Sequence, residues 1–420
     1  MQAILTYDVV VVGGGSSGLA AAIGAVQAGR KVLLIERNSY FGGQATHCSL
    51  PSYCGFFTQG DPYEQVVGGV GAELLKQMAD LGFYKGPRRT AKTGTTSVIL
   101  DAEEIKYTMD KMVSEAGVDV FLDVQVIGAV VENNELKAIE CISDEGRFQV
   151  EAKAFVDATG EANLTAFALG KYIVGDGQGA LQPGTMMLRI GGISHGADIH
   201  PDTVAAAIRK GKAQGIGPMS KELGINFRAK GDSGDVMFIL PDEGVNGLDP
   251  VSLTHAEMSG RRQAWAYLKT FRQFLPGCEK AYVVRTGPKI GIRETRHIIG
   301  DYTLTAEDVL EGKRFPDAIA RGGWPVEMHP GPGLPNIMQF VKDRSYYDIP
   351  LRSLKVSNLQ NLWAAGRIIC CDRVAFASVR VMGTGFATGQ AAGVAAALTA
   401  GGTQDVNQIR SELLRQNALI

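Results

Sequence analysis

The feature that most constrains this chain is a glycine-rich turn between an apolar run and a helical segment close to the N-terminus. Residues 9–18 read VVVVGGGSSG, and residues 19–28 continue with a helical pattern. Four β-branched residues in succession are typical of a parallel strand that is buried on both faces. A buried strand, a glycine turn and a helix together indicate a βαβ unit and therefore an α/β fold.

Each glycine of this turn has its own expected role. Gly13 permits the tight turn, Gly15 lets a pyrophosphate approach the backbone, and Gly18 lets the helix pack closely on the strand. A second strand over residues 31–35 ends at Glu36, whose carboxylate can accept hydrogen bonds from a ribose diol. The turn, the helix amino terminus and this carboxylate predict a dinucleotide site.

A run of strand-like segments follows a helix predicted over residues 101–116, with Asp101 as its N-cap. These segments lie at 118–122, 124–132, 135–143 and 147–151, and the pair Asn133-Asn134 predicts a hairpin turn. Two further buried strands are expected within residues 154–160 and 361–367. The pattern predicts a β-meander beside a parallel sheet.

The predicted pattern of secondary structure changes between residues 169 and 343, where short strands alternate with helices near 201–214 and 250–274. We therefore expect an α/β protein with a Rossmann-like domain, a parallel sheet plus a β-meander, formed by residues 1–168 and 344–420. Residues 169–343 would form an inserted mixed α+β substrate domain.

Composition excludes several classes of function. The 420 residues carry a net charge of −2, which gives no basic surface for nucleic acid or for an anionic membrane. The first residues lack the pattern of a secretory signal, and the apolar stretch 386–400 is too short and too interrupted to span a bilayer. Six cysteines without framework spacing indicate a reducing compartment, so cytoplasm is expected, and no spacing predicts a metal site.

The ordered set of motifs resembles the FAD-dependent oxidoreductases, two-domain flavoproteins distantly related to the flavoproteins of succinate dehydrogenase and fumarate reductase. The resemblance covers nearly the whole chain. It rests on the first turn with Glu36 and on the segments 42–43, 155–160, 291–296, 347–354 and 361–367. It implies FAD as cofactor and leaves the substrate open.

The resemblance also implies which residues surround FAD. Gly43 and its neighbours would pass the pyrophosphate, Gly366 would approach the ribityl chain, and the amides near Gly385 would face the pyrimidine edge. The complete cofactor-binding set is Gly13, Gly15, Ser17, Gly18, Glu36, Arg37, Gly42, Gly43, Gln44, Ala45, Thr46, Val126, Ala158, Thr159, Gly160, Gly366, Arg367, Gly383 and Gly385. His47 stands where some flavoproteins attach FAD covalently, but noncovalent binding is the interpretation adopted here.

Candidate catalytic residues gather in the second half of the chain: His329, Arg293, Arg352, Tyr347 and His297. Arg293 and Arg352 would orient a substrate, and two arginines near a flavin suit a carboxylate. His329, in a loop rich in proline and glycine, is the first candidate base. The alternatives are a structural ion network for the Arg293–Arg296 segment and simple packing for Tyr347.

We therefore expect an FAD-dependent dehydrogenase or oxidase that transfers hydride between a small polar substrate and flavin N5. Two alternatives are a flavin-dependent reductase of an activated double bond and a flavoprotein without net redox turnover. A weaker alternative is an NAD-binding protein. The sequence has only one complete dinucleotide turn, so no NAD(P) domain is expected and an external electron acceptor is required. A homo-oligomer is compatible with these features.

Overall fold

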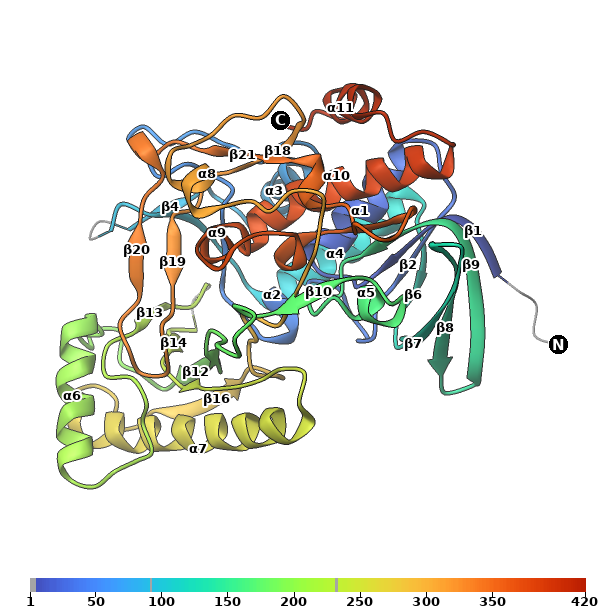
Figure 1. Ribbon diagram of the computed structural model, residues 1–420. Coiled ribbons are helices and arrows are strands. Elements are labelled where there is room, and N and C mark those ends of the chain that lie inside the picture. The colour runs from blue at the N-terminus through green and yellow to red at the C-terminus, as the bar shows by residue number, and fades with distance from the viewer. Residues whose placement is uncertain (1–4, 91–92, 231–232) are drawn as a thin grey trace.

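The computed structural model describes residues 5–90, 93–230 and 233–420. Its centre is a seven-stranded sheet, on the right of Figure 1. The strand order is β6 (Asp119–Phe121), β2 (Val32–Ile35), β1 (Leu5–Val12), β9 (Gly146–Asp157), β8 (Glu135–Ser143) and β7 (Gln125–Glu132), and β22 (Leu362–Ala364) also pairs with β9. β6, β2, β1, β9 and β22 are mutually parallel, and β7, β8 and β9 form an antiparallel meander. The predicted Rossmann-like sheet with a meander is confirmed.

The apolar run of β1 is buried on both faces, as its composition predicts. Val9 and Val11 belong to the larger apolar cluster, whereas Val10 and Val12 belong to the cluster on the opposite face. This alternation follows from the two-residue period of a strand. β1 therefore lies at the centre of the sheet, and its carboxyl end holds the glycine turn.

One strand differs from the sequence-based expectation. The sequence predicts two separate strands, at residues 147–151 and within 154–160, but the structure has the single strand β9. Its first part pairs antiparallel with β8, and it also pairs in parallel with β1 along most of its length. The predicted hairpin turn is confirmed, since Asn133 and Asn134 have φ values of 49° and 63°.

Two helices that are far apart in the sequence pack tightly together. They are α1 (Ser16–Gln27) and α10 (Met382–Ala400). A Cβ atom on Gly389 would lie 2.1 Å from the carbonyl oxygen of Ser17, and one on Gly393 would lie 2.0 Å from that of Ala21. Ordinary contacts begin at 3.4 Å, so only glycine allows this approach. We call this contact the glycine seam.

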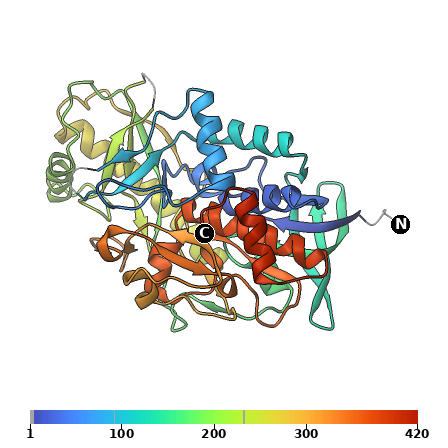
Figure 2. The ribbon, with the colours of Figure 1, turned by 90° about the horizontal axis from the view of Figure 1, so that it is seen from above.

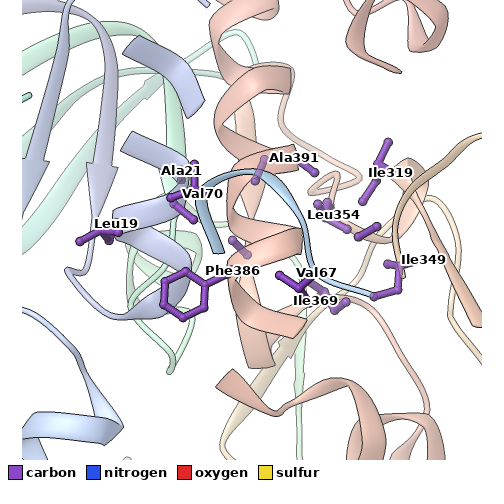
Figure 3. Packing of buried hydrophobic residues seen from close by; sticks show 14 of the residues in the cluster. Leu19, Ala21, Val67, Val70, Ile319, Ile349, Leu354, Ile369, Phe386 and Ala391 are labelled. Carbon is purple, nitrogen blue, oxygen red and sulfur yellow. The ribbon is translucent and has the colours of Figure 1, made fainter. Parts of the chain in front are cut away.

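Around the seam, large apolar side chains complete the main core. Figure 3 shows Phe386 of α10 and Leu19 of α1 among the buried side chains of the larger apolar cluster. Both side chains are fully buried. α1 and α10 therefore share one core.

A second sheet forms the part of the molecule at the lower left of Figure 1, and Figure 2 shows the same part from above. Its antiparallel strands are β13 (Ile225–Arg228), β14 (Val236–Ile239), β12 (Leu188–Gly191) and β16 (Tyr282–Thr286), covered by α6 (Pro201–Ala213) and α7 (Pro250–Phe274). Both helices begin at a capping residue, His200 and Asp249, followed by proline. The helices predicted near 201–214 and 250–274 are confirmed.

Short elements connect and surround the two sheets. The helices are α2 (Gln44–His47), α3 (Gly69–Asp80), α4 (Ala102–Ala116), α5 (Asn163–Phe167), α8 (Ala306–Leu310), α9 (Arg373–Val379), α11 (Val406–Arg415), and the 3₁₀ turns η1 (Lys342–Arg344), η2 (Leu351–Ser353) and η3 (Gly366–Ile368). The strands are β3 (Ser52–Cys54), β4 (Arg88–Arg89), β5 (Thr96–Ile99), β10 (Tyr172–Val174), β11 (Gly184–Thr185), β15 (Asp242–Glu243), β17 (Arg296–Ile298), β18 (Ala318–Gly322), β19 (Val326–Met328), β20 (Ile337–Gln339) and β21 (Tyr347–Pro350). Asp101 caps α4, as predicted.

The chain returns to the main core before residue 343. Leu304, Phe315 and Ile319 all belong to the larger apolar cluster, together with residues of α1 and α10. The domain limits at residues 168 and 343 stay predictions. Within the part of the chain that the structure describes, no helix combines the length and apolar character that crossing a membrane requires.

Candidate functional site

A cavity of about 340 Å³ opens at the carboxyl ends of the parallel strands. It is lined by Val12 at the end of β1, by Glu36 after β2, by Ala158 after β9 and by Ala365 after β22. Open α/β sheets bind their ligands at this edge. The strand order of the sheet therefore places the cavity where the sequence predicts the dinucleotide.

The first glycine turn forms one wall of this cavity, and two of its glycines are required by packing. A Cβ atom on Gly13, whose φ is +104°, would lie 2.4 Å from the carbonyl oxygen of Ala158. A Cβ atom on Gly18 would lie 1.6 Å from the carbonyl oxygen of Gly13. Gly15 instead lines the cavity and faces Gly43, whose backbone a Cβ at Gly15 would meet at 3.6 Å. Gly13 and Gly18 thus have the packing positions that the sequence predicts, and the approach of a pyrophosphate at Gly15 stays a prediction.

Glu36 lies buried at the cavity wall and is held by backbone amides. Its carboxylate accepts hydrogen bonds from the amides of Gly14 at 2.6 Å and Asn38 at 2.9 Å. The side-chain amide of Asn38 also donates to this carboxylate, so one of its about four acceptor positions remains for a ribose hydroxyl. Its role toward the ribose stays a prediction.

A group of charged side chains also lines the cavity. Glu161 lies 2.7 Å from Arg367 and 3.8 Å from Arg37, and all three line the cavity. Gly160, with φ of +78°, leaves room for the Arg367 guanidinium, because a Cβ there would lie 2.9 Å from its nitrogen. Among the described residues, Glu161 Oε2 and Arg367 Nε are buried without hydrogen-bond partners. The Arg367 guanidinium suits a phosphate, and the Glu161 oxygen suits a hydroxyl or N–H donor of the same cofactor.

His47 also lines the cavity and is neutral near pH 7. Burial, followed by the charges of Lys289 and Arg37, lowers its pKa from 6.5 to about 4. Its Nδ1 lies 3.4 Å from the hydroxyl of Tyr40. Noncovalent attachment of the flavin stays a prediction.

The amino terminus of α10 lies at the same cavity as that of α1. Met382 and Gly385 line it from one helix, and Ser16 and Ser17 from the other. Gly385 leaves space for a neighbour, since a Cβ there would lie 2.9 Å from Ser17 Oγ. Two helix amino termini give the cavity a positive potential that favours an anionic ligand.

Most of the predicted cofactor set lines the cavity. Its members there are Gly13, Gly15, Ser17, Glu36, Arg37, Gly43, Gln44, Val126, Ala158, Thr159, Gly160, Gly366, Arg367 and Gly385. The structure does not place Gly18, Gly42, Ala45, Thr46 or Gly383 on its wall.

These five residues support the wall from behind. Thr46 donates its hydroxyl proton to the carbonyl oxygen of Phe41 at 2.7 Å, and Gly42 leaves space for the Thr46 side chain. Gly383 instead packs against the backbone of Cys54, 2.4 Å from a would-be Cβ. For the fourteen residues that line the cavity, contact with the cofactor stays a prediction. The positions of the other five residues agree with a role in supporting the cavity wall.

Arg293 and His329, the two main catalytic candidates, come together next to this cavity. Arg293 Nη1 lies 3.8 Å from Asp242, and His329 Nε2 lies 3.8 Å from Glu327. Burial, followed by the charge of Arg380, lowers the pKa of Arg293 to about 10. Arg380 lines the cavity and donates a hydrogen bond to the carbonyl oxygen of Glu327 at 3.0 Å. Arg380 therefore connects the cavity with the Arg293–His329 group.

The remaining three catalytic candidates do not line the cavity. Arg352 is half exposed and pairs with Asp317 at 2.8 Å on the surface, because the turn after β21 directs it away from the cavity. Tyr347 is fully buried, and its hydroxyl is 2.8 Å from Ser378 Oγ. The expected substrate role of Arg352 and the catalytic role of Tyr347 are therefore corrected to an ion pair and to packing.

His297 also lies outside the cavity wall. It is 2% exposed, its Nε2 lies 3.3 Å from Glu294, and its ring packs edge-on against Phe376. Neither His297 nor Glu294 lines the cavity. The structure therefore places His297 in a buried packing position, and its catalytic role stays a prediction.

Sequence reasoning missed four residues of this region: Glu161, Gln182, Lys221 and Arg380. Glu161 directly follows Gly160, and Arg380 stands three residues before Gly383, so proximity to a motif was a usable signal for both. Lys221 pairs with Asp242 at 3.2 Å, and Gln182 Oε1 accepts a hydrogen bond from the backbone amide of His329. These two lie in segments without a motif, and only the fold brings them to the site.

Known proteins resemble this chain over different lengths. Residues 8–418 match the family described as FAD dependent oxidoreductase. A thiamine thiazole synthase from Methanococcus aeolicus is 30% identical over 168 residues, which cover 40% of this chain and 60% of that protein. Digeranylgeranylglycerophospholipid reductase 1 from Methanococcoides burtonii is 25% identical over 172 residues, 37% of this chain and 38% of that protein. The chain thus spans less than two thirds of the length of these relatives.

A solved structure supports the fold. The myxobacterial chondrochloren halogenase CndH, a variant of the FAD-dependent halogenases, superimposes with a TM-score of 0.50 at 14% identity, covering 98% of this chain and 79% of that one. The family match extends over nearly the whole sequence, and the cavity has the wall that a flavin dinucleotide needs. This chain therefore belongs to the FAD dependent oxidoreductase family, and its cofactor is FAD.

Proposed function

We propose that this protein oxidises a small polar substrate that carries a carboxylate, in the region between the cavity and His329. The observation that carries the proposal is the position of Arg380. This side chain lines the cofactor cavity and also bonds to Glu327, two residues from His329. A substrate that contacts Arg380 is thereby within reach of both the cofactor and the Arg293–His329 group.

Arg293 and Arg380 suit the carboxylate of such a substrate. Their side chains are only 15% and 12% exposed, so each guanidinium is largely withdrawn from water. A charge-assisted hydrogen bond is stronger in such surroundings than at the surface. Holding the carboxylate would fix the substrate relative to the cofactor, which is a main contribution of a protein to flavin chemistry.

The oxidation requires two transfers from the substrate. FAD, when bound, supplies the hydride acceptor, so a substrate C–H bond breaks and both of its electrons leave with the hydrogen. The proton of the adjacent O–H or N–H group goes to a base, and a C=O or C=N bond forms. His329 is the proposed base, because it stands two residues from Glu327, whose carbonyl oxygen accepts the hydrogen bond of Arg380.

An anaerobic screen of metabolites for bleaching of the flavin tests this proposal. Carboxylates that carry a hydroxyl or amino group on the adjacent carbon should bleach the flavin of the holoenzyme, and the matching amides should not. His329→Gln should slow bleaching about 100-fold or more, as expected for loss of a general base. Arg352→Ala, outside the cavity, is the matched control and should react like the parent. Equal rates for parent and His329→Gln would exclude the proposed base.

The same screen addresses the reverse direction. If chemically reduced enzyme is reoxidised by an activated double bond and no metabolite bleaches the oxidised enzyme, the protein is a reductase. If metabolites do not bleach the oxidised enzyme and double bonds do not reoxidise the reduced enzyme, the protein is a flavoprotein without redox turnover.

We also propose an external electron acceptor and a cytoplasmic location, and six free cysteines support the reducing compartment. Size-exclusion chromatography of the holoenzyme tests whether it forms a homo-oligomer.

A further inference from the structure

Five large apolar side chains are exposed around β10, and none of them has a role in the proposed function. They come from the end of α5, the loop after it, β10 itself and the residue after β17. Backbone pairing brings these segments together, since the amide of Ile299 donates to the carbonyl oxygen of Lys171 at 2.9 Å. We call the five side chains, which are 38–81% exposed, the β10 surface: Phe167, Leu169, Tyr172, Ile173 and Ile299.

Leu169 is the most exposed of the five and has a strained backbone. It follows Ala168, the C-cap of α5, with φ of 54°, a left-handed conformation that glycine or asparagine ordinarily adopts at this position. The amide of Gly170 donates to the carbonyl oxygen of Thr165 at 2.8 Å, as is usual in such a turn. A leucine in this conformation costs free energy, and at 81% exposure packing within its own chain returns little of it. A contact with another molecule would offset this cost.

β10 is also the edge strand of a two-stranded ribbon. Among the described residues it pairs only with β17, so its other edge has no partner strand. Tyr172 and Ile173 point to opposite faces of the ribbon, as successive residues of a strand do, and both are exposed. A segment that lies along the free edge therefore covers both side chains. An edge with exposed apolar side chains on both faces is suited to pairing with another chain.

The β10 surface reaches the cofactor cavity at two points. Phe167 belongs to the surface and also lines the cavity. The guanidinium carbon of Arg296 lies 5.0 Å from the centre of the Tyr172 ring, and Arg296 Nη1 donates to the carbonyl oxygen of Glu161 at 3.0 Å. Glu161 lines the cavity. A molecule seated on the β10 surface therefore covers the cavity at Phe167 and also contacts the Tyr172–Arg296 pair.

The area of the surface is that of one side of a protein interface. Large apolar side chains have about 150–250 Å² each, so at these exposures the five present about 350–600 Å². A standard interface buries about 800 Å² on each partner, of which about 56–65%, or about 450–520 Å², is apolar. The β10 surface thus supplies the apolar part of one standard interface.

The charges beside the surface suit a second copy of the chain. The exposed charged residues within two positions of it in the sequence are Lys171 and Asp301. Neither forms an ion pair with a described residue. Their opposite signs give no net attraction to an anionic lipid surface. In a two-fold contact, Lys171 of one copy can approach Asp301 of the other.

We infer that a second copy of this chain occupies the β10 surface, with the two β10 edges side by side, and that this dimer closes the cofactor cavity at Phe167. The inference goes beyond the proposed function, because it holds whatever the substrate is. Leu169 becomes buried in the dimer, which offsets the cost of its backbone conformation. Phe167 is covered, so FAD leaves the dimer more slowly than the monomer.

Sedimentation equilibrium of the holoenzyme tests the dimer. The parent should have twice the 44.8 kDa mass of one chain. Leu169→Glu buries a charge in the contact and should weaken association about 100-fold or more. Leu414→Glu, the same change at an exposed leucine of α11, is the matched control and should associate like the parent. A parent that is monomeric at every concentration, or a dimer that survives Leu169→Glu, would overturn the inference.

Leu169→Asn separates a contact from a structural role. Asparagine tolerates the left-handed conformation, so at dilutions where both proteins are monomeric the variant should unfold at a higher urea concentration than the parent. It should nevertheless dimerise about tenfold more weakly, because the leucine contact is lost. A variant that is more stable and dimerises as tightly as the parent would contradict burial of Leu169 in the dimer.

Release of FAD tests the link to the cavity. After dilution, flavin fluorescence should appear about tenfold faster from Leu169→Glu than from the parent or Leu414→Glu. Equal rates would overturn the closing of the cavity. Sedimentation with phosphatidylcholine vesicles addresses a different occupant. A monomeric parent that sediments with these vesicles, and a Leu169→Glu variant that does not, would assign the surface to a lipid bilayer and overturn the dimer.

Discussion

The glycine seam between α1 and α10 allows a quantitative test through Gly393→Ala. The new Cβ would lie 2.0 Å from the carbonyl oxygen of Ala21, where ordinary contact begins at 3.4 Å. Because the obstacle is backbone, no side-chain rotation relieves it, and the helices must separate by about 1.4 Å. Overpacking of this severity costs about 3 kcal/mol, and the better helix propensity of alanine returns about 1 kcal/mol. A net loss of about 2 kcal/mol in unfolding free energy is expected.

Separating α1 from α10 should also weaken the binding of FAD, because both helices begin at the cavity. We expect FAD affinity to fall about tenfold, equivalent to about 1.4 kcal/mol. Urea unfolding of the apoprotein measures stability, and the recovery of flavin fluorescence on dilution measures affinity. Gly196→Ala is the control, since a Cβ there would meet nothing within 4 Å. If Gly393→Ala unfolds at the same urea concentration as Gly196→Ala, the tight seam is refuted.

Three further substitutions test the charged groups. Arg367→Gln leaves Glu161 without its partner at 2.7 Å, so FAD should bind about 30-fold or more weakly in a fluorescence titration, and unchanged affinity would contradict that role. The pKa of His47 falls from 6.5 to about 4 on folding, so the unfolded chain binds more protons and stability decreases as the pH drops through this window. Urea unfolding should show a smaller decrease for His47→Gln, and an identical pH dependence would exclude this cause. Arg352→Ala should change stability by less than about 1 kcal/mol and leave FAD affinity unaltered, because its pair with Asp317 is half exposed.

The parts of the fold that are determined by residues adjacent along the chain could be predicted from the sequence. The strand, turn and helix of residues 9–28 and the capped helices α4, α6 and α7 are local patterns, and each appears as expected. β9 was divided in two because its polar first part and apolar second part read as different strands. In the structure, the single strand β9 pairs both with β8 of the meander and with β1 of the parallel sheet. The periodicity of the sequence alone does not show that one strand makes both pairings.

The candidate site shows the same limit. Arg293 and Arg352 read alike as arginines within motifs, but only Arg293 is buried beside His329, while Arg352 faces water. Arg380 connects the cavity with His329, and in the sequence only its proximity to Gly383 marks it. The side on which a side chain emerges from a turn depends on the packing of the whole fold, so residue type and spacing do not determine it.

The glycine seam has a consequence for how the protein is made. α1 starts at residue 16 and α10 at residue 382, so at about 5–20 residues per second α1 waits roughly 20–70 s during synthesis for its partner helix. Throughout this interval its apolar side chains lack the cover that α10 provides. The cavity also lacks Gly385 until then, so a nascent chain cannot hold FAD as the finished protein does. Retention of FAD thus reports that synthesis has passed α10, and cells short of flavin should accumulate finished chains that have empty cavities and are more readily degraded.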